Sequence, residues 1–319
     1  MTLHAIPANP VPEGAAAGEI RAPDGVQLRY ARWNPTAPRR GTVCVFTGRG
    51  DMIEKYFEVV EELRRRGFAV TLLDWRGQGG SQRRLRDPRK GYVKSFDEYQ
   101  VDLETLIREV VLPDCPPPYF ALGHSMGGLI LLEAVKQGRR WFDRIVLTAP
   151  LLHFTGTRGR WFAPYAANVA RLVGLGRMYV PGGEPIAISH RPFHGNRATS
   201  DPVRYERTAS IVQSAPDLAL GSPTVAWAHA AYKVMKRVNE SSYATEIRQP
   251  LLILAAGKDN VVSNPAIERF ATRLRAGAHL VVLGSRHEIL MERDVFRSQF
   301  WAAFDAFIPG SQTGAPPYR

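Results

Sequence analysis

The sequence has few cysteines, no long apolar run and a deficit of acidic residues. Its two cysteines, Cys44 and Cys115, provide neither a disulfide framework nor a thiolate metal set. No apolar run approaches the roughly 18–20 residues of a membrane span. The first residues lack a basic segment followed by an apolar core, so we expect no signal peptide and a cytoplasmic protein.

The most informative feature that is present is the pentapeptide at 123–127, which reads Gly-His-Ser-Met-Gly. An apolar run at 119–122 precedes it and a helix-like run at 129–135 follows it. A serine on such a sharp strand-to-helix turn needs small neighbours, and its hydroxyl lies at the carboxyl edge of a sheet. This context predicts that Ser125 is a nucleophile, and a glycine-rich connecting turn is the alternative.

A nucleophilic serine needs a base and an acid that orients the base. The apolar run 250–256 reads as a buried parallel strand, and Asp259 lies just beyond it. The run 279–283 reads as the last strand, and His287 lies in the loop that follows. Ser125, Asp259 and His287 therefore all leave one edge of the sheet, in the chain order of a Ser-Asp-His triad.

Other histidines, and another role for Asp259, are alternatives to this assignment. We expect the side chain of His124 to point away from the substrate, and a turn-forming role is the alternative for Asp259. The strand-like run 145–149 ends without a carboxylate that could replace it. Four histidines of the middle region are candidates for lining a pocket: His153, His190, His194 and His229.

An oxyanion hole would complete such a site, with fixed backbone N–H donors for the developing negative charge. Met126, directly after the nucleophile, is the firmer candidate. The second donor is expected in the loop after the strand-like run 42–46, which reads Thr47-Gly48-Arg49-Gly50. Arg49 is preferred there, and Gly48 is the alternative.

Together these motifs resemble the α/β-hydrolase group that contains monoacylglycerol lipases and bacterial lysophospholipases, often called hydrolase 4 or serine aminopeptidase S33-like. The matching segments cover most of the chain: 24–30, 47–50 with Lys55-Tyr56, 74–81, 123–128, 257–259 and 286–288. Segments 199–205 and 221–227 are similar to the lysophospholipase L2 branch. One departure is Thr47-Gly48, where the group usually has His-Gly; we expect the backbone donor to survive.

The resemblance implies an α/β fold: a mainly parallel eight-stranded sheet with helices on both faces and an inserted lid. Helical apolar spacing at 99–110, 57–63 and 296–308 agrees with alternating strands and helices. We expect a core formed by 19–150 and 244–310, a lid at 151–243, and flexible tails at 1–18 and 311–319.

The expected lid is dense in glycine, proline and aromatic residues. Its aromatic side chains either line a pocket for an acyl chain or form a small core of the lid itself: Phe154, Trp161, Phe162, Tyr165, Tyr179, Phe193 and Trp227.

The formal net charge is +12, and basic residues are dense in the loop 83–90 on the catalytic edge. We expect this loop to contact anionic membrane or to steer phosphate-bearing lipids to the site, with a solvated loop as the alternative. No recognised nucleic-acid module is present, so we expect no specific nucleic-acid partner.

The resemblance implies a serine hydrolase that cleaves the acyl ester of a lysophospholipid or monoacylglycerol through an acyl-enzyme on Ser125. Alternatives on the same fold are an esterase, a thioesterase, a peptidase or an acyltransferase with a different substrate. A non-catalytic binding protein is the remaining class. The chemistry needs no cofactor or metal, and the sequence signals none.

Overall fold

The computed structural model describes residues 2–36, 39–156, 168, 171, 174–186 and 191–311. One sheet has the strand order β1-β2-β4-β3-β5-β6-β7-β8. Strand β2 is antiparallel to β1 and β4, and the other neighbouring strands are parallel, which confirms the predicted sheet. The strands are β1 Ala15–Arg21, β2 Gln27–Trp33, β3 Thr42–Phe46, β4 Ala69–Leu73, β5 Tyr119–His124, β6 Arg144–Thr148, β7 Leu251–Ala256 and β8 Gly277–Val282.

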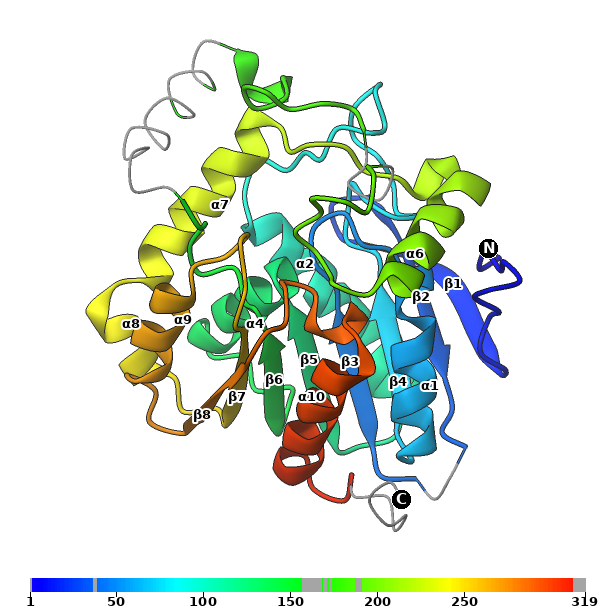
Figure 1. Ribbon diagram of the computed structural model, residues 1–319, viewed down its shortest axis with the longest axis vertical. Coiled ribbons are helices and arrows are strands. Elements are labelled where there is room, and N and C mark those ends of the chain that lie inside the picture. Colours follow the sequence, from blue (N-terminus) through cyan, green and yellow to red (C-terminus); the bar gives the residue numbers. More distant parts are fainter. Residues whose placement is uncertain are drawn as a thin grey trace.

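Helices cover both faces of this sheet (Figure 1). Because alternate residues of a strand point to opposite faces, Val43 and Val45 pack with α1 and α10, whereas Cys44 and Phe46 pack with α2 and α4. The longer helices are α1 Phe57–Arg65, α2 Asp97–Leu106, α4 Met126–Lys136, α6 Pro202–Ser214, α7 Val225–Val238, α9 Asn264–Ala271 and α10 Asp294–Phe307. Shorter elements are η1 Ile53–Tyr56, η2 Ile107–Val111, α3 Leu112–Asp114, η4 Leu175–Arg177, η6 Pro216–Leu218, α8 Ser241–Glu246 and η7 Ile289–Met291.

The three helices expected from apolar spacing are present as α1, α2 and α10. The predicted stripe on α2 is buried from Tyr99 to Val110, although the helix itself ends at Leu106 and a π-helical turn continues it. Among the described residues, no helix has the length and apolar character needed to cross a bilayer.

The N-terminal segment differs from the flexible tail expected up to Gly18. Strand β1 already begins at Ala15, where the main chain pairs with Trp33 of β2. Upstream, the Asn9 side chain donates to the Glu54 carbonyl at 2.9 Å, and the Trp33 indole N–H donates to the Pro12 carbonyl at 3.1 Å. Small side chains suggested looseness, but strand pairing uses the main chain and does not need large side chains.

The segment between β6 and β7 carries α6 and α7, which attach to the core at separate places. Arg204 of α6 forms an ion pair with Glu58 of α1 at 2.5 Å. Trp227 of α7 donates to the Tyr99 hydroxyl at 3.1 Å and packs against Phe96. Helix α8 crosses the expected lid boundary at residue 243. Trp161, Phe162, Tyr165 and His190 lie outside the described residues.

Candidate active site

The turn between β5 and α4 holds Ser125 in a backbone conformation that side chains rarely adopt, with φ +50°. Its amide donates to the Thr148 carbonyl of β6 at 3.0 Å. A Cβ on Gly127 would lie 2.3 Å from the Phe46 carbonyl oxygen, and one on Gly123 would lie 2.7 Å from Leu131. Gly127 is therefore required because α4 starts directly against the end of β3, and Gly123 allows α4 to pack closely on β5.

The three residues predicted to act together form a continuous hydrogen-bond chain. His287 Nε2 lies 3.0 Å from Ser125 Oγ, and His287 Nδ1 lies 2.7 Å from Asp259 Oδ2. The backbone amides of residues 261 and 262 donate to Asp259 Oδ1 at 2.7 and 2.9 Å. Burial acts to raise the pKa of Asp259, but the bond from His287 and these amides hold that pKa below its usual value.

His124 contradicts the expectation that it points away from the site. Its ring centroid is 5.0 Å from that of His287, and its Nδ1 lies 3.2 Å from the Thr148 hydroxyl. Both histidine rings line one cavity together with Ser125. Burial, followed by the neighbouring His287, lowers the pKa of His124 to about 3. His124 is thus a neutral ring that packs beside the proposed base.

The loop after β3 distinguishes between the two candidate oxyanion donors. The Gly48 N–H donates to Asp51 Oδ2 at 2.9 Å, and the Gly48 carbonyl accepts from Gln78 Nε2 at 2.9 Å. Within the described part of the chain, the amides of Arg49 and Met126 have no hydrogen-bond partner. The geometry therefore favours Arg49 over Gly48 as the donor that accompanies Met126.

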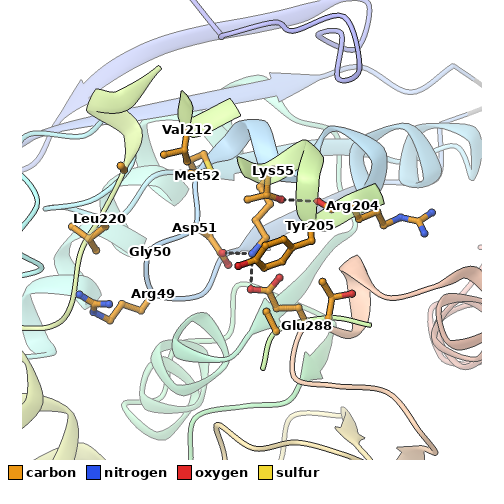
Figure 2. Close-up of a pocket in the computed structure, with 14 residues that line it drawn as sticks. Arg49, Gly50, Asp51, Met52, Lys55, Arg204, Tyr205, Val212, Leu220 and Glu288 are labelled. Carbon is orange, nitrogen blue, oxygen red and sulfur yellow. Dashed lines mark hydrogen bonds and ion pairs between the residues drawn. The ribbon is translucent and has the colours of Figure 1, made fainter. Parts of the chain in front are cut away.

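A buried ionic cluster beneath this loop was not anticipated (Figure 2). Lys55 Nζ lies 2.6 Å from Asp51 and 2.7 Å from Glu288, the residue after His287. The Tyr56 hydroxyl donates to Asp51 at 2.9 Å. Burial opposes the charge on Lys55, but the two carboxylates raise its pKa above the usual value. Lys55 therefore joins the oxyanion loop to the loop of the proposed base.

Trp75 and Gln78 are further contributors from the motif at 74–81, whose role the sequence did not reveal. The Trp75 indole donates to the Thr47 carbonyl at 3.0 Å, and Gln78 also accepts from the Gly50 amide at 3.3 Å. Thr47, which replaces the usual histidine, is buried, and its hydroxyl has no partner among the described residues. Neighbouring side chains thus hold the main chain of this loop.

A cavity of about 730 Å³ opens above Ser125 and His287. Its apolar lining includes Leu151, Phe154, Trp227 and Val261, and its basic lining includes Arg49, Arg191 and Arg197. Of the aromatic residues expected in the lid, Phe154 and Trp227 thus line the cavity. Phe193 instead packs on Tyr205, and Tyr179 bonds to Asp87. His194 also lines this cavity, whereas His153 and His229 line a different one.

Comparisons with known proteins agree with this architecture. Lysophospholipase L2 of Escherichia coli K12 is 30% identical over 88% of this chain and 83% of its own length. A probable lysophospholipase L2 of Haemophilus influenzae is 27% identical over 89% of this chain and 88% of its own. A soluble variant of monoglyceride lipase from Saccharomyces cerevisiae, at 20% identity, superposes with a TM-score of 0.74 and covers 93% of this chain and 97% of that one.

The mainly parallel eight-stranded sheet, with a serine at a tight turn after β5, defines an α/β-hydrolase fold. The family model described as Hydrolase_4, serine aminopeptidase S33, matches residues 37–294, and the chain belongs to this family. The resemblance inferred from the motifs is therefore confirmed, together with the expectation of a hydrolase.

Proposed function

We propose that this chain is a carboxylic ester hydrolase that cleaves the acyl ester of a lysophospholipid or a monoacylglycerol. The observation that carries the proposal is the hydrogen-bond chain from Ser125 through His287 to Asp259. Relatives named lysophospholipase L2, and monoglyceride lipases that match a shorter part of the chain, support this class of substrate. The apolar lining of the cavity offers a place for the acyl chain.

In the proposed reaction, His287 takes the Ser125 proton as Oγ bonds to the ester carbonyl carbon. The amides of Met126 and Arg49 hold the oxygen that becomes negative. The carbon–oxygen bond to the glycerol side then breaks, and the alcohol leaves with the proton from His287. Water, deprotonated by His287, attacks the acyl carbon; the bond to Ser125 Oγ breaks, the fatty acid leaves, and His287 returns the proton to Oγ. Asp259 keeps His287 in the tautomer that presents Nε2 to Ser125.

The test is fatty-acid release from a lysophospholipid and a monoacylglycerol of the same acyl chain, with Ser125→Ala as the control. We expect release from at least one of them, and a fall of at least about a thousandfold in the variant because the nucleophile is absent. Release of fatty acid from neither lipid, with soluble short esters still cleaved, would retain the triad and refute the substrate class.

We further propose that residues 83–90 make peripheral contact with the anionic inner membrane face. Arg86 and Arg89 are exposed. Arg83 turns inward, where it donates to the carbonyls of Gly77 and Gly79 at 2.8 Å, and Arg84 pairs with Glu98. The contact therefore rests on Arg86, Arg89 and their neighbours rather than on the whole loop.

Co-sedimentation with vesicles tests this contact. We expect binding to vesicles that contain an anionic lipid, weaker binding to neutral vesicles, and weakening by salt. Arg86→Gln should reduce binding to anionic vesicles. Binding that depends on neither lipid charge nor salt would refute the proposal.

A further inference from the structure

Arg49 is a partly buried basic residue of the active-site cavity that has no acidic partner among the described residues. Within the described part of the chain it forms no ion pair, whereas Lys55 pairs with two carboxylates. Nη2 of Arg49 donates to the Gly221 carbonyl at 2.7 Å, and the guanidinium carbon lies 5.2 Å from the centroid of the Trp227 ring. Its Nε is buried without a partner among the described residues.

Keeping a partly buried cation without a counter-ion is unfavourable, since burial removes water that would solvate the charge. Burial accordingly lowers the pKa of Arg49 to about 10, which still leaves the guanidinium charged at neutral pH. A planar guanidinium with donors to spare is the group that proteins use to bind phosphate and carboxylate. The Arg49 guanidinium is therefore a charged group with donors available to bind an anion.

The charges of the surrounding cavity favour an anionic ligand. The cavity lining contains two acidic residues, Asp51 and Glu288, and both are bound to Lys55. Arg191 and Arg197 lie on the same lining and are exposed. Arg191 is 3.4 Å from the exposed Glu184, a pair that solvent weakens. Figure 2 shows the Arg49 side chain extending away from the Lys55 cluster.

The position of Arg49 relative to the reaction connects this cation to the substrate. Its backbone amide is the proposed donor to the ester carbonyl oxygen, so its side chain starts next to the reacting group. In a lysophospholipid only the glycerol backbone separates that carbonyl from the phosphate. A substrate held by the Arg49 amide therefore has its headgroup within reach of the side chain of the same residue.

We propose that the Arg49 guanidinium binds the phosphate of a lysophospholipid and so selects lysophospholipids over monoacylglycerols, which lack this group. This inference rests on the proposed ester hydrolase function and identifies which of its two lipid classes is preferred. Arg49 then has two roles: its main chain contacts the reacting carbonyl, and its side chain determines the headgroup.

The test compares kcat/KM for a lysophosphatidylcholine and a monoacylglycerol whose identical acyl chains are short enough to keep both monomeric. Wild type, Arg49→Lys, Arg49→Met and the control Arg275→Met, at an exposed position before β8, are measured. We expect wild type to prefer the lysophospholipid. Arg49→Met should lower the ratio of the two kcat/KM values about tenfold or more, mainly through KM, because a charge-assisted hydrogen bond is lost. Arg49→Lys should retain part of the preference, and Arg275→Met all of it.

Equal losses on both substrates in Arg49→Met would overturn the inference, because they would mean that Arg49 only fastens the segment around Trp227 to the core. A wild-type preference for monoacylglycerol would also overturn it while leaving the ester hydrolase function intact. If wild type cleaves neither lipid but still cleaves short esters, the proposed substrate class fails, and this inference fails with it.

A second measurement needs no variant that might fold poorly. sn-Glycerol 3-phosphate, inorganic phosphate and glycerol are each added to wild type during hydrolysis of a soluble neutral ester. We expect competitive inhibition by glycerol phosphate at concentrations where glycerol has no effect, and weaker inhibition by inorganic phosphate if the glycerol backbone contributes. Equal inhibition by glycerol phosphate and glycerol would overturn the role of the phosphate.

Discussion

The turn that carries Ser125 leaves no room for a side chain at Gly127. The residue lies where α4 begins, and its Cα faces the carbonyl oxygen of Phe46 at the end of β3. The neighbouring Gly128 faces Pro150, where an added Cβ would be 3.1 Å from the proline side chain. A methyl group added at Gly127 would therefore clash with the main chain, whereas one added at Gly128 would make a milder contact with a proline side chain.

We predict that Gly127→Ala lowers the free energy of unfolding by about 1–3 kcal/mol through overpacking. Its kcat on a soluble ester should fall at least about tenfold, because the turn that carries Ser125 must shift. Gly128→Ala is the matched control and should remain close to wild type, because the gain in helix propensity offsets a milder contact. Thermal unfolding and ester hydrolysis of both variants check this, and equal behaviour of the two would contradict the steric argument.

The individual site residues were predictable because each follows a local pattern. Ser125, Asp259 and His287 stand just beyond the carboxyl ends of β5, β7 and β8, and parallel strands bring such positions to one edge. The orientation of His124 was not predictable in this way. Its ring turns toward His287 through contacts with residues far away in the sequence, such as Thr148.

At the scale of elements, the loop between β3 and η1 is held by side chains from elsewhere. Gln78 contacts it at two points, accepting from the Gly50 amide and donating to the Gly48 carbonyl. Because Gly48 is tied at both its N–H and its carbonyl, the following amide of Arg49 has a fixed direction.

We predict that Gln78→Ala lowers kcat about 10–100-fold with a smaller change in KM, since a misdirected oxyanion donor weakens the transition state more than the bound substrate. Gln82→Ala is the control, because Gln82 is exposed and its side chain accepts from the Gln27 amide at the start of β2. Steady-state kinetics on a soluble ester would check both variants. An unchanged kcat in Gln78→Ala would show that the loop holds its conformation without this side chain.

Sequence patterns could not predict these loop contacts. Gln78 contacts Gly48, which is 30 positions away in the sequence, and Lys55 contacts Glu288, which is much farther away along the chain. Hydrophobic periodicity specifies strands and helices, but it carries no information about which buried polar side chains pair. The motifs that contain Lys55 and Gln78 were visible, yet the roles of these residues required the fold.

At the scale of the whole molecule, an ionic cluster around Glu58 joins three helices. Glu58 of α1 binds Arg204 and Arg207 of α6 and Arg297 of α10, each at 2.5 to 2.8 Å. Burial acts to raise the pKa of Glu58, but hydrogen bonds and charge from these arginines lower it from 4.5 to about 2. The cluster thus attaches part of the inserted segment to the core.

We predict that Glu58→Gln lowers the melting temperature at pH 7 by about 2–4 °C, an estimate that allows for solvent screening of a partly exposed pair. Because the folded pKa lies below the unfolded one, this contribution is present above pH 4.5 and is lost as the pH falls toward 2. The difference between wild type and variant should therefore shrink below pH 4.5. Glu19→Gln on the exposed surface of β1 is the control, and a difference that persists at low pH would contradict the linkage.

The Lys55 cluster has a consequence for how this protein can vary among its relatives. One ammonium pairs with two carboxylates that lie far apart along the chain, at positions 51 and 288. Loss of the lysine alone would leave one buried and one partly buried negative charge close to the place where the reaction itself creates a third. We therefore expect positions 51, 55 and 288 to change as a set during divergence, so that the identity of any one of them predicts the other two.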